Sequence, residues 1–304
     1  MKVAVLMSTY NGEQFIIEQL DTIKEQKDVE CFLFIRDDGS SDNTLNIIEE
    51  YKDKHPNFYI EIITGKNLGV ARSFMYLLDY VSERMDFDYF AFADQDDYWF
   101  NDKLSCAIQS LQGNNCESGL YMSQYQMADV LLNKIETHFF NPKLKLENAL
   151  ANNIATGCTM VFNKYLVKQL TKYNPRFITM HDYWIYLVAV SINAYIYYDT
   201  TPHFLYRQHS NNVIGGKRDN FVKRWRLRWR KLFEDGNHFV SKMCSEILEG
   251  YATDIPPHNY KLLMRASRVK NIWNRFYLLL NMKIFGTTLD KTIRCKLLIL
   301  TGKY

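Results

Sequence analysis

The chain has 304 residues, a formal net charge of +3 and a 47% share of hydrophobic residues. This composition is typical of a folded globular protein with a sizeable core, and it excludes an intrinsically disordered chain. The six cysteines include no C-x-x-C pair, and the chain opens on a strand pattern instead of a cleavable signal, so we expect a cytoplasmic protein. The most apolar stretch, 183–198, is shorter than the roughly 20 residues that a membrane-spanning helix needs.

The first part of the chain, up to about residue 110, alternates short β-rich apolar runs with longer amphipathic ones. This alternation is typical of a parallel sheet covered by helices. The predicted strands are Val3–Ser8, Cys31–Ile35, Phe58–Thr64 and Tyr89–Ala93, and the predicted helices are Glu13–Gln26, Asp42–Lys52 and Val70–Glu83.

The middle of the chain is mixed, and its last third is helical. We expect strands at Gly119–Ser123, Gly157–Phe162 and Ala194–Tyr198, and a long apolar helix headed by Asp182. From Asn220 onward the pattern is helical, and Gly215-Gly216 marks a predicted boundary.

The run Asp94-Gln95-Asp96-Asp97 follows the strand at Tyr89–Ala93 and holds three carboxylates in four positions. Such a density of negative charge at the end of a buried strand calls for a cation, which predicts a divalent metal site. The alternative is a polar turn in which Asp97 caps the next helix.

Polar residues follow each predicted strand of the first part, at Ser8–Asn11, Asp37–Ser40, Asn67–Gly69 and Asp94–Asp97. The carboxyl ends of parallel strands meet at one edge of a sheet, so these clusters are expected to share a cleft. Such a cleft suits a nucleotide. Tyr10 offers a flat ring for stacking, Asp38 offers a carboxylate for hydrogen bonds to the base or ribose, and a metal would bind the diphosphate. The chain has neither G-x-G-x-x-G nor a P-loop motif, which disfavours dinucleotide folds and P-loop kinases.

These motifs, S-T-Y-N-G (Ser8–Gly12), D-D-G-S-S-D (Asp37–Asp42), N-L-G (Asn67–Gly69) and a D-x-D within 94–97, make the chain resemble the family 2 inverting glycosyltransferases with the GT-A fold. A-D-Q-D-D-Y-W (93–99), H-D-Y-W (181–184) and Y-R-Q-H-x-N-N (206–212) are similar to bacterial rhamnosyltransferases of surface-polysaccharide assembly. The resemblance implies an α/β fold with a Rossmann-like, mostly parallel sheet flanked by helices. It implies a catalytic domain at 1–215 and a helical basic extension at 216–304.

The resemblance also assigns roles to residues. It implies that the nucleotide-sugar donor is bound by residues at the strand ends and in the later motif, namely Ser8, Thr9, Tyr10, Asp38, Asn67, Asp94 and Arg207. It implies a divalent metal, Mg²⁺ or Mn²⁺, held by Asp96 with Asp97 and His209. Ser8 and Thr9 have an equally good interpretation as strand-end turn residues, and Asp37 and Asp42 are predicted to serve in turns and helix caps.

Asp182 is the candidate general base, because an inverting transfer needs one carboxylate to take the proton of the acceptor hydroxyl. The alternative is that Asp182 only caps the apolar helix that follows it. His181 is expected to lie near the acceptor or behind the base. Trp184 is expected either to stack on a sugar or to lie in the core. Cys158 is predicted to be a buried small hydrophobe and not a nucleophile.

Basic residues dominate the last third. Lys217–Lys231 holds eight lysines and arginines against Asp219, and from Lys261 onward Asp290 is the only carboxylate. An aromatic stripe (Phe221, Trp225, Trp229) flanked by cations predicts a peripheral enzyme on the inner face of the bacterial plasma membrane. The alternatives are packing on the catalytic domain or on a second subunit, which would make a homo-oligomer, and a nucleic-acid surface, which we do not favour.

The predicted function is thus transfer of a sugar, with rhamnose from dTDP-rhamnose as the first choice, to a saccharide or a polyprenyl-diphosphate-linked saccharide in cell-surface polysaccharide synthesis. A transferase of the same family that uses a UDP-hexose or UDP-N-acetylhexosamine is the alternative. A non-catalytic protein that binds membrane or nucleic acid is the alternative from another class.

Overall fold

The structure, a computed structural model, describes residues 1–84, 86–112, 117–137, 140–209 and 238–304. Its strands are β1 (Lys2–Thr9), β2 (Glu30–Asp37), β3 (Tyr59–Thr64), β4 (Tyr89–Ala93), β5 (Tyr98–Trp99), β6 (Gly119–Ser123), β7 (Gln126–Ala128), β8 (Val161–Asn163), β9 (Tyr195–Asp199) and β10 (Phe204–Arg207). Its helices are α1 (Ile16–Lys24), α2 (Thr44–Lys54), α3 (Val70–Ser82), α4 (Lys103–Gln112), α5 (Leu146–Ala151), α6 (Lys164–Leu170), α7 (His181–Ser191), α9 (Phe239–Tyr251), α10 (Pro257–Ser267), α11 (Ile272–Leu280) and α12 (Leu289–Thr301).

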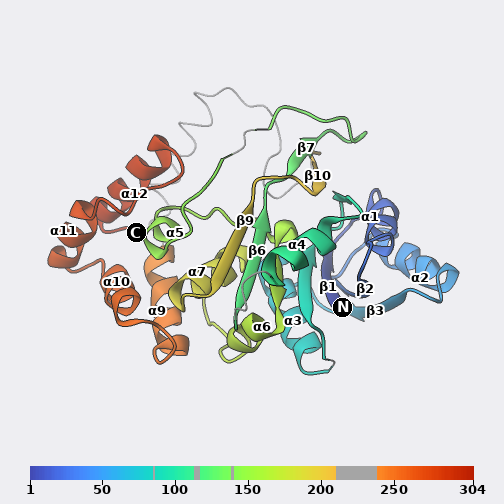
Figure 1. Cartoon of the computed structure of the whole chain (residues 1–304), viewed down its shortest axis with the longest axis horizontal. Helices are drawn as coiled ribbons and strands as arrows, with labels where there is room; N and C mark the ends of the chain where they lie inside the picture. The colour runs from blue at the N-terminus through green and yellow to red at the C-terminus, as the bar shows by residue number, and fades with distance from the viewer. Residues whose placement is uncertain (85, 113–116, 138–139, 210–237) are drawn as a thin grey trace.

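A seven-stranded sheet in the order β3-β2-β1-β4-β8-β6-β9 runs through the molecule (Figure 1). β3, β2, β1 and β4 are mutually parallel, β8 runs antiparallel to both of its neighbours, and β6 pairs with β9 in parallel. The predicted α/β fold with a mostly parallel sheet is therefore confirmed. All four strands and all three helices predicted for the first part are present, with ends shifted by three residues or fewer.

Each face of the sheet has its own apolar core, because the side chains of a strand alternate between its two faces. In β1, Val3 and Val5 pack with α1, α2 and α4 on one face. Ala4 and Leu6 point to the other face, where α3, α6 and α7 cover the sheet. This double cover leaves only the strand ends free for a ligand.

The structure differs from the sequence prediction at Gly157–Phe162. Residues Gly157–Thr159 form a 3₁₀ turn, and only Val161–Asn163 is a strand. The turn lets the backbone pass close to the ring of His181, since a Cβ at Gly157 would overlap that ring. The short strands β5, β7 and β10 of a second, three-stranded sheet were not predicted, because runs of two to four residues carry little periodic signal.

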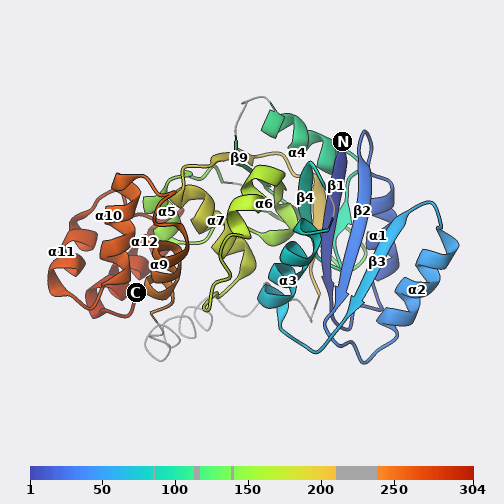
Figure 2. The ribbon, with the colours of Figure 1, turned by 90° about the horizontal axis from the view of Figure 1, so that it is seen from below.

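The helices α9–α12 stack beyond α7 at the end of the molecule opposite α2 (Figure 2). Every residue of α7 is buried, because the sheet lies on one side of it and α9 on the other. Such an all-buried helix is expected to be hydrophobic all round. The predicted boundary at Gly215-Gly216 and the basic stripe at 217–231 lie outside the described residues. Among the described helices, none has the length and apolar composition needed to cross a bilayer.

Candidate functional site

The carboxyl ends of β1, β2 and β4 form one edge of the sheet. The strand register pairs Thr9 with Asp37 and Met7 with Ala93. The polar residues that follow these strands therefore lie together at this edge, as their positions after parallel strands predicted.

Gln95 joins the first polar cluster to the acidic one. Its side-chain oxygen accepts the N–H of Tyr10 at 2.9 Å, and its amide nitrogen donates to the carbonyl of Tyr10 at 3.1 Å. A Cβ at Gly12 would overlap this amide, so the paired contact needs a glycine there. Tyr10 is 49% exposed, so its side chain is accessible to a ligand at this edge. Gln95 was not among the residues predicted to form the site.

The carboxylate of Asp38 is buried and has three donors. It accepts the N–H groups of Leu68 and Gly69, each at 2.8 Å, and it forms an ion pair with Arg36. Gly69 has a φ of +77°, which places its N–H in this turn. The carboxylate thus ties the loop after β3 to β2, and a direct contact of Asp38 with a nucleotide stays a prediction.

The other residues predicted to bind the donor also make contacts within the protein. The Ser8 hydroxyl donates to Ser73 Oγ at 2.7 Å, and the buried Thr9 hydroxyl donates to Asp37 Oδ2 at 3.1 Å. The side-chain oxygen of Asn67 accepts the Gly69 N–H at 3.1 Å. These contacts agree with the strand-end interpretation.

Asp37 and Asp42 serve in turns, as predicted. The Asp37 carboxylate accepts the N–H groups of Gly39 and Ser40, at 3.1 and 2.8 Å. Asp42 accepts the N–H of Thr44, the first residue of α2, at 3.0 Å.

The acidic run continues below the surface of this edge. Asp94, Asp97 and Cys158 place one ligand atom each within 4.8 Å of one another. Burial and the neighbouring charge of Asp96 raise the pKa of Asp94 to about 7, and burial together with Asp94 raises the pKa of Asp97 well above its usual range. The two carboxylate oxygens of Asp97 have no hydrogen-bond partner among the described residues. Three carboxylates so close together, one of them unpartnered and fully buried, favour the binding of a cation.

Lys103, at the start of α4, is buried near the same cluster. Its ammonium lies 3.3 Å from the ring centroid of Trp99, and burial lowers its pKa to about 7. The charges of Asp97 and Asp94 act in the opposite direction and favour the charged form. Lys103 therefore offsets part of the negative charge, and it was not among the residues predicted to form the site.

Asp96 and His209 are in direct contact, with His209 Nε2 2.7 Å from Asp96 Oδ2. They come from positions 113 residues apart, and the His209 ring lies 5.0 Å from the ring of Phe15. The structure thus brings two of the three predicted metal ligands together. Asn211 and Asn212 of the same motif lie outside the described residues.

Arg207 is buried beneath this pair. It donates to the carbonyl oxygen of Asp96 at 3.0 Å and to that of Val130 at 2.6 Å, and it forms an ion pair with Glu18. These contacts hold the backbone of Asp96 in place. A contact of Arg207 with a phosphate stays a prediction.

The carboxylates at this edge have the chemistry that a divalent cation of the Mg²⁺ or Mn²⁺ type prefers, although Asp97 clusters with Asp94 and Cys158, and Asp96 and His209 are not part of that cluster. Hard divalent cations prefer carboxylate oxygens, and Mn²⁺ also accepts imidazole nitrogen. The observation that supports the fit is the pair of unpartnered, fully buried Asp97 oxygens beside Asp94 and Asp96.

Asp182, the candidate base, lies in the first turn of α7 and is 5% exposed. Its Oδ1 accepts the N–H of Tyr183 at 2.5 Å and the amide of Asn153 at 3.3 Å. Burial raises the pKa of Asp182 to about 6, although these hydrogen bonds act against the shift. The charge of Asp182 contributes to the raised pKa of Asp94, so the two carboxylates are electrostatic neighbours. The helix cap itself is Met180, which contradicts the interpretation of Asp182 as the N-cap.

His181 and Trp184 are buried in the core beside this carboxylate. The His181 ring stacks on Phe74 at 4.1 Å and meets Phe92 edge-on at 5.1 Å, and burial lowers its pKa to about 3. Trp184 is fully buried, so it is a core residue and not a stacking surface for a sugar. Cys158 is fully buried and burial raises the pKa of its thiol, as expected for a residue that is not a nucleophile.

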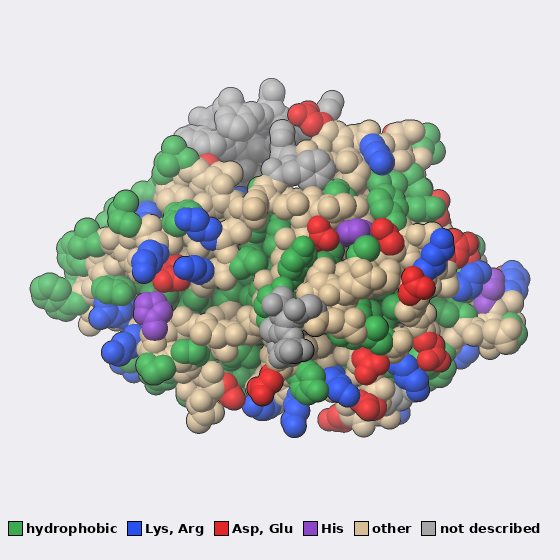
Figure 3. Space-filling model, viewed as in Figure 1, with side chains coloured by type: hydrophobic (Ala, Val, Ile, Leu, Met, Phe, Trp, Pro, Cys, Tyr) green, Lys and Arg blue, Asp and Glu red, His purple; other side chains and the backbone are tan. Residues whose placement is uncertain are grey.

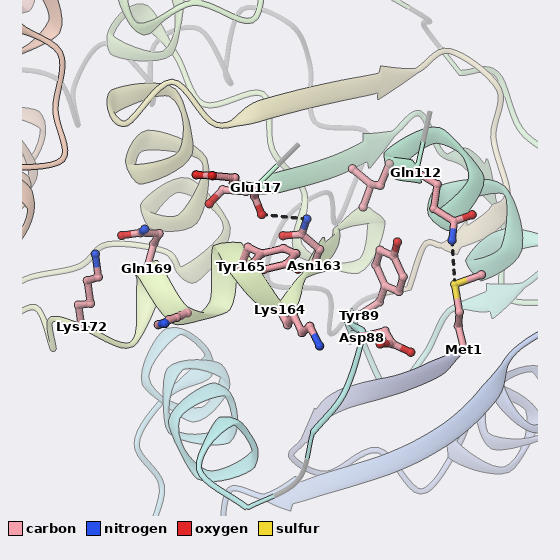
Figure 4. A pocket seen from close by; sticks show the side chains of 13 residues that line it. Met1, Asp88, Tyr89, Gln112, Glu117, Asn163, Lys164, Tyr165, Gln169 and Lys172 are labelled. Carbon is pink, nitrogen blue, oxygen red and sulfur yellow. Dashed lines mark hydrogen bonds between the residues drawn. The ribbon is translucent and has the colours of Figure 1, made fainter. Parts of the chain in front are cut away.

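A wide hollow lies at the opposite edge of the sheet, near the starts of β1 and β4 (Figure 4). Gln112 donates to the Met1 sulfur across it at 3.1 Å, and Asn163 donates to the Glu117 carbonyl at 3.4 Å. Lysines of α6, among them Lys168, line its rim. The hollow lies away from the carboxyl ends of the parallel strands, so we do not assign the donor to it.

The chain is similar in sequence to known glycosyltransferases. The sequence model of the family described as Glycosyl transferase family 2 matches residues 4–171. The dTDP-rhamnosyl transferase RfbG of Shigella flexneri is 34% identical over 263 residues, which are 82% of this chain and 85% of that protein. The UDP-Glc:alpha-D-GlcNAc-diphosphoundecaprenol beta-1,3-glucosyltransferase WfgD of Escherichia coli is 30% identical over 63% of this chain and 70% of its own length.

Solved structures share the fold. Staphylococcus aureus TarS 1-349 in complex with UDP-GlcNAc aligns over all of this chain and 82% of its own, with a TM-score of 0.60 and 16% identity. The mannosyltransferase PcManGT of Pyrobaculum calidifontis, in complex with GDP-Man and Mn2+, aligns over 99% of this chain and 73% of its own, with a TM-score of 0.56 and 18% identity.

Proposed function

Because the chain belongs to glycosyl transferase family 2, it is a glycosyltransferase, and we propose that it is an inverting, metal-dependent one that uses dTDP-rhamnose. Family membership removes the alternative of a non-catalytic binding protein. The single observation that supports the mechanism is the proximity of the buried Asp182 to Asp94, which forms a cluster of candidate metal ligands with Asp97 and Cys158.

The donor would lie along the strand ends. The exposed side chain of Tyr10 offers a surface for the base, and the loop held by Asp38 shapes the pocket beside it. The diphosphate would approach Asp96, since the Gln95 contact joins this loop to the end of β1. A divalent cation held by Asp96, Asp97 and His209 would neutralise the charge of the departing diphosphate.

Asp182 would act as the general base. The acceptor oxygen attacks the anomeric carbon while the bond from that carbon to the diphosphate oxygen breaks, and the electron pair of this bond leaves with the nucleoside diphosphate. The proton of the acceptor hydroxyl passes to a carboxylate oxygen of Asp182. Attack from the side opposite the leaving group inverts the anomeric carbon. A base with a pKa of about 6 is ionised at neutral pH and still binds a proton readily.

The acceptor is proposed to be a saccharide or a saccharide on a polyprenyl diphosphate, in the synthesis of a surface polysaccharide. The relative WfgD is a glucosyltransferase whose acceptor is GlcNAc on a diphosphoundecaprenol. An acceptor of this kind would require the enzyme to work at the inner face of the plasma membrane. A transferase that uses a UDP-hexose or UDP-N-acetylhexosamine is the second candidate, because WfgD uses UDP-Glc.

A donor panel tests this proposal. Differential scanning fluorimetry with dTDP-rhamnose, UDP-glucose and UDP-N-acetylglucosamine, each with and without Mn²⁺, should show the largest rise in melting temperature for dTDP-rhamnose with metal. Asp96→Ala should remove the metal-dependent part of this rise. Asp86→Ala, at an exposed carboxylate before the start of β4 and so at the other end of that strand, is the matched control and should leave it unchanged. No shift and no transfer with any donor would overturn the proposal.

A further inference from the structure

The helix α11 presents its apolar side to solvent. Trp273 is 78% exposed and Leu280 is 76% exposed, and Ile272 and Phe276 are each exposed by half. At 3.6 residues per turn these four positions fall on one side of the helix. Leu278 is the one residue of α11 that is fully buried. A helix of a globular protein normally buries its apolar side, so this orientation marks an interaction surface.

The same surface continues onto α12. Leu289, Ile293 and Leu300 lie on one side of that helix and are exposed, and Met282, between the two helices, is 86% exposed. Figure 3 shows hydrophobic side chains gathered at this end of the molecule, with lysine and arginine side chains among them. We call this surface the apolar end face; it is formed by Ile272, Trp273, Phe276, Leu280, Met282, Leu289, Ile293 and Leu300.

The charge around this face is positive. From Lys261 to the end of the chain there are ten lysines and arginines and one carboxylate, Asp290. The exposed basic residues include Lys261, Arg268, Lys270, Lys283 and Arg294. Exposed apolar and aromatic side chains in the same helices as exposed basic ones are the composition of a surface that lies in the headgroup region of an anionic bilayer.

We propose that the apolar end face docks on an anionic bilayer, with Trp273 and Leu280 inserted among the headgroups and the basic residues paired with lipid phosphates. A second copy of the chain is the less suitable occupant. A two-fold interface would bring the same positive surfaces together, and the like charges would repel one another.

The apolar end face is also connected to Asp182, the proposed base. Between α11 and α12, the carbonyl oxygen of Phe285 accepts the side-chain amide of Asn148 at 3.0 Å, and the N–H of Thr287 donates to Asn152 Oδ1 at 2.9 Å. The next residue, Asn153, donates to Asp182. This run of asparagines at the end of α5 fixes the docking helices relative to the candidate base. The reason for docking, access to a lipid-linked acceptor, rests on the proposed function.

Vesicle flotation tests the docking. The protein should float with vesicles of phosphatidylethanolamine and phosphatidylglycerol, should float much less with phosphatidylcholine vesicles, and should dissociate as the salt concentration rises. The double variant Trp273→Ser/Leu280→Ser should reduce binding at least tenfold. The separate double variant Lys270→Glu/Lys283→Glu should also bind more weakly than the parent in low salt, since each basic residue contributes roughly fivefold to binding. Leu131→Ser is the matched control, because Leu131 is also 78% exposed, and it should bind as the parent does.

Two further measurements separate the outcomes. All variants should retain the melting temperature and the donor-dependent shift of the parent, so a loss of vesicle binding cannot come from unfolding. Vesicle binding without any donor shift would overturn the proposed function and leave the docking intact. Absence of binding to anionic vesicles, or equal binding by the Trp273→Ser/Leu280→Ser variant, would overturn the docking. A dimer seen by sedimentation that this variant dissociates, without vesicle binding, would assign the face to a second copy instead and would also overturn it.

Discussion

The proposed catalytic edge, at the carboxyl ends of β1, β2 and β4 and the start of α7, has two halves in which buried carboxylates have different surroundings. In the donor half, at the ends of β1 and β2, Asp37 and Asp38 are buried and each accepts at least two backbone N–H groups. In the transfer half, at the end of β4 and the start of α7, Asp97 has no hydrogen-bond donor among the described residues. Burial raises the pKa values of Asp94 and Asp182 there, although Asp182 accepts two hydrogen bonds. A buried carboxylate whose charge is balanced by its donors stabilises a fold, whereas one with a raised pKa is available for protons, cations and substrates. The following predictions test this contrast.

The largest effect is expected on the rate of transfer. Asp182→Asn removes the base with almost no change in shape, so kcat should fall by about 10³-fold while donor binding stays within a fewfold of the parent. Transfer to a soluble acceptor and the donor-dependent melting shift measure the two quantities. A kcat within tenfold of the parent would remove Asp182 from its assigned role.

Replacing a carboxylate of the donor half should lower the stability of the protein. Asp38→Asn leaves Arg36 without its buried partner and turns an amide toward the N–H groups of Leu68 and Gly69. Breaking a buried ion pair by removal of one partner costs roughly 3–5 kcal/mol, and we expect a loss of that size in the free energy of unfolding. Urea denaturation measures it. Asp42→Asn, at a more exposed turn carboxylate, is the control and should cost less than half as much.

Much of this contrast could be predicted from the sequence, and the reasons are local. The strands before Asp37 and Asp94 show the right periodicity, and the turn residues after them follow from glycine and asparagine chemistry. The contacts of Gln95 with Tyr10 and of Asn153 with Asp182 could not be predicted, because they join residues 85 and 29 positions apart. The apolar side of α11 could not be placed either, since the pattern I-W-N-R-F-Y-L-L-L is the same whether that side faces the core or solvent.

Stability should change in the opposite direction in the transfer half. The pKa of Asp182 is raised by burial from its ordinary value of 3.8 to about 6, so the folded state binds this proton more tightly than the unfolded state does. Stability is therefore lost as the pH rises from about 4 through about 6, and the full cost above that range is roughly 3 kcal/mol. Asp182→Asn should remove this cost and be more stable than the parent at neutral pH.

The pH dependence of that gain identifies its cause. Near pH 4 the parent carboxyl is protonated, and the two proteins should unfold at the same denaturant concentration. If Asp182 served mainly to stabilise the start of α7, its replacement would lower the stability at neutral pH, which is the opposite result.

The contact between Gln95 and Tyr10, which connects the two halves, should contribute less to the free energy of unfolding. Gly12→Ala places a Cβ on the Gln95 amide and should lower the free energy of unfolding by about 1–3 kcal/mol. Gln95→Ala removes the two hydrogen bonds with Tyr10 and should cost about 1–2 kcal/mol. In the double variant the clash is absent, so the combined loss should be clearly smaller than the sum of the two. Additive losses would mean that Gly12 and Gln95 do not interact.

The smallest effect is expected in the pH profile of turnover. At saturating donor and metal, kcat should rise with pH and level off above about pH 6, because Asp182 must be ionised to accept the proton of the acceptor. At one pH unit below that pKa the rate should be roughly tenfold lower than on the plateau. Asn153→Ala removes a hydrogen bond that favours the ionised carboxylate, so it should move the midpoint to higher pH while the plateau rate changes little. A midpoint that stays in place would show that the amide of Asn153 only positions the loop after α5, and that burial alone sets the proton affinity of the base.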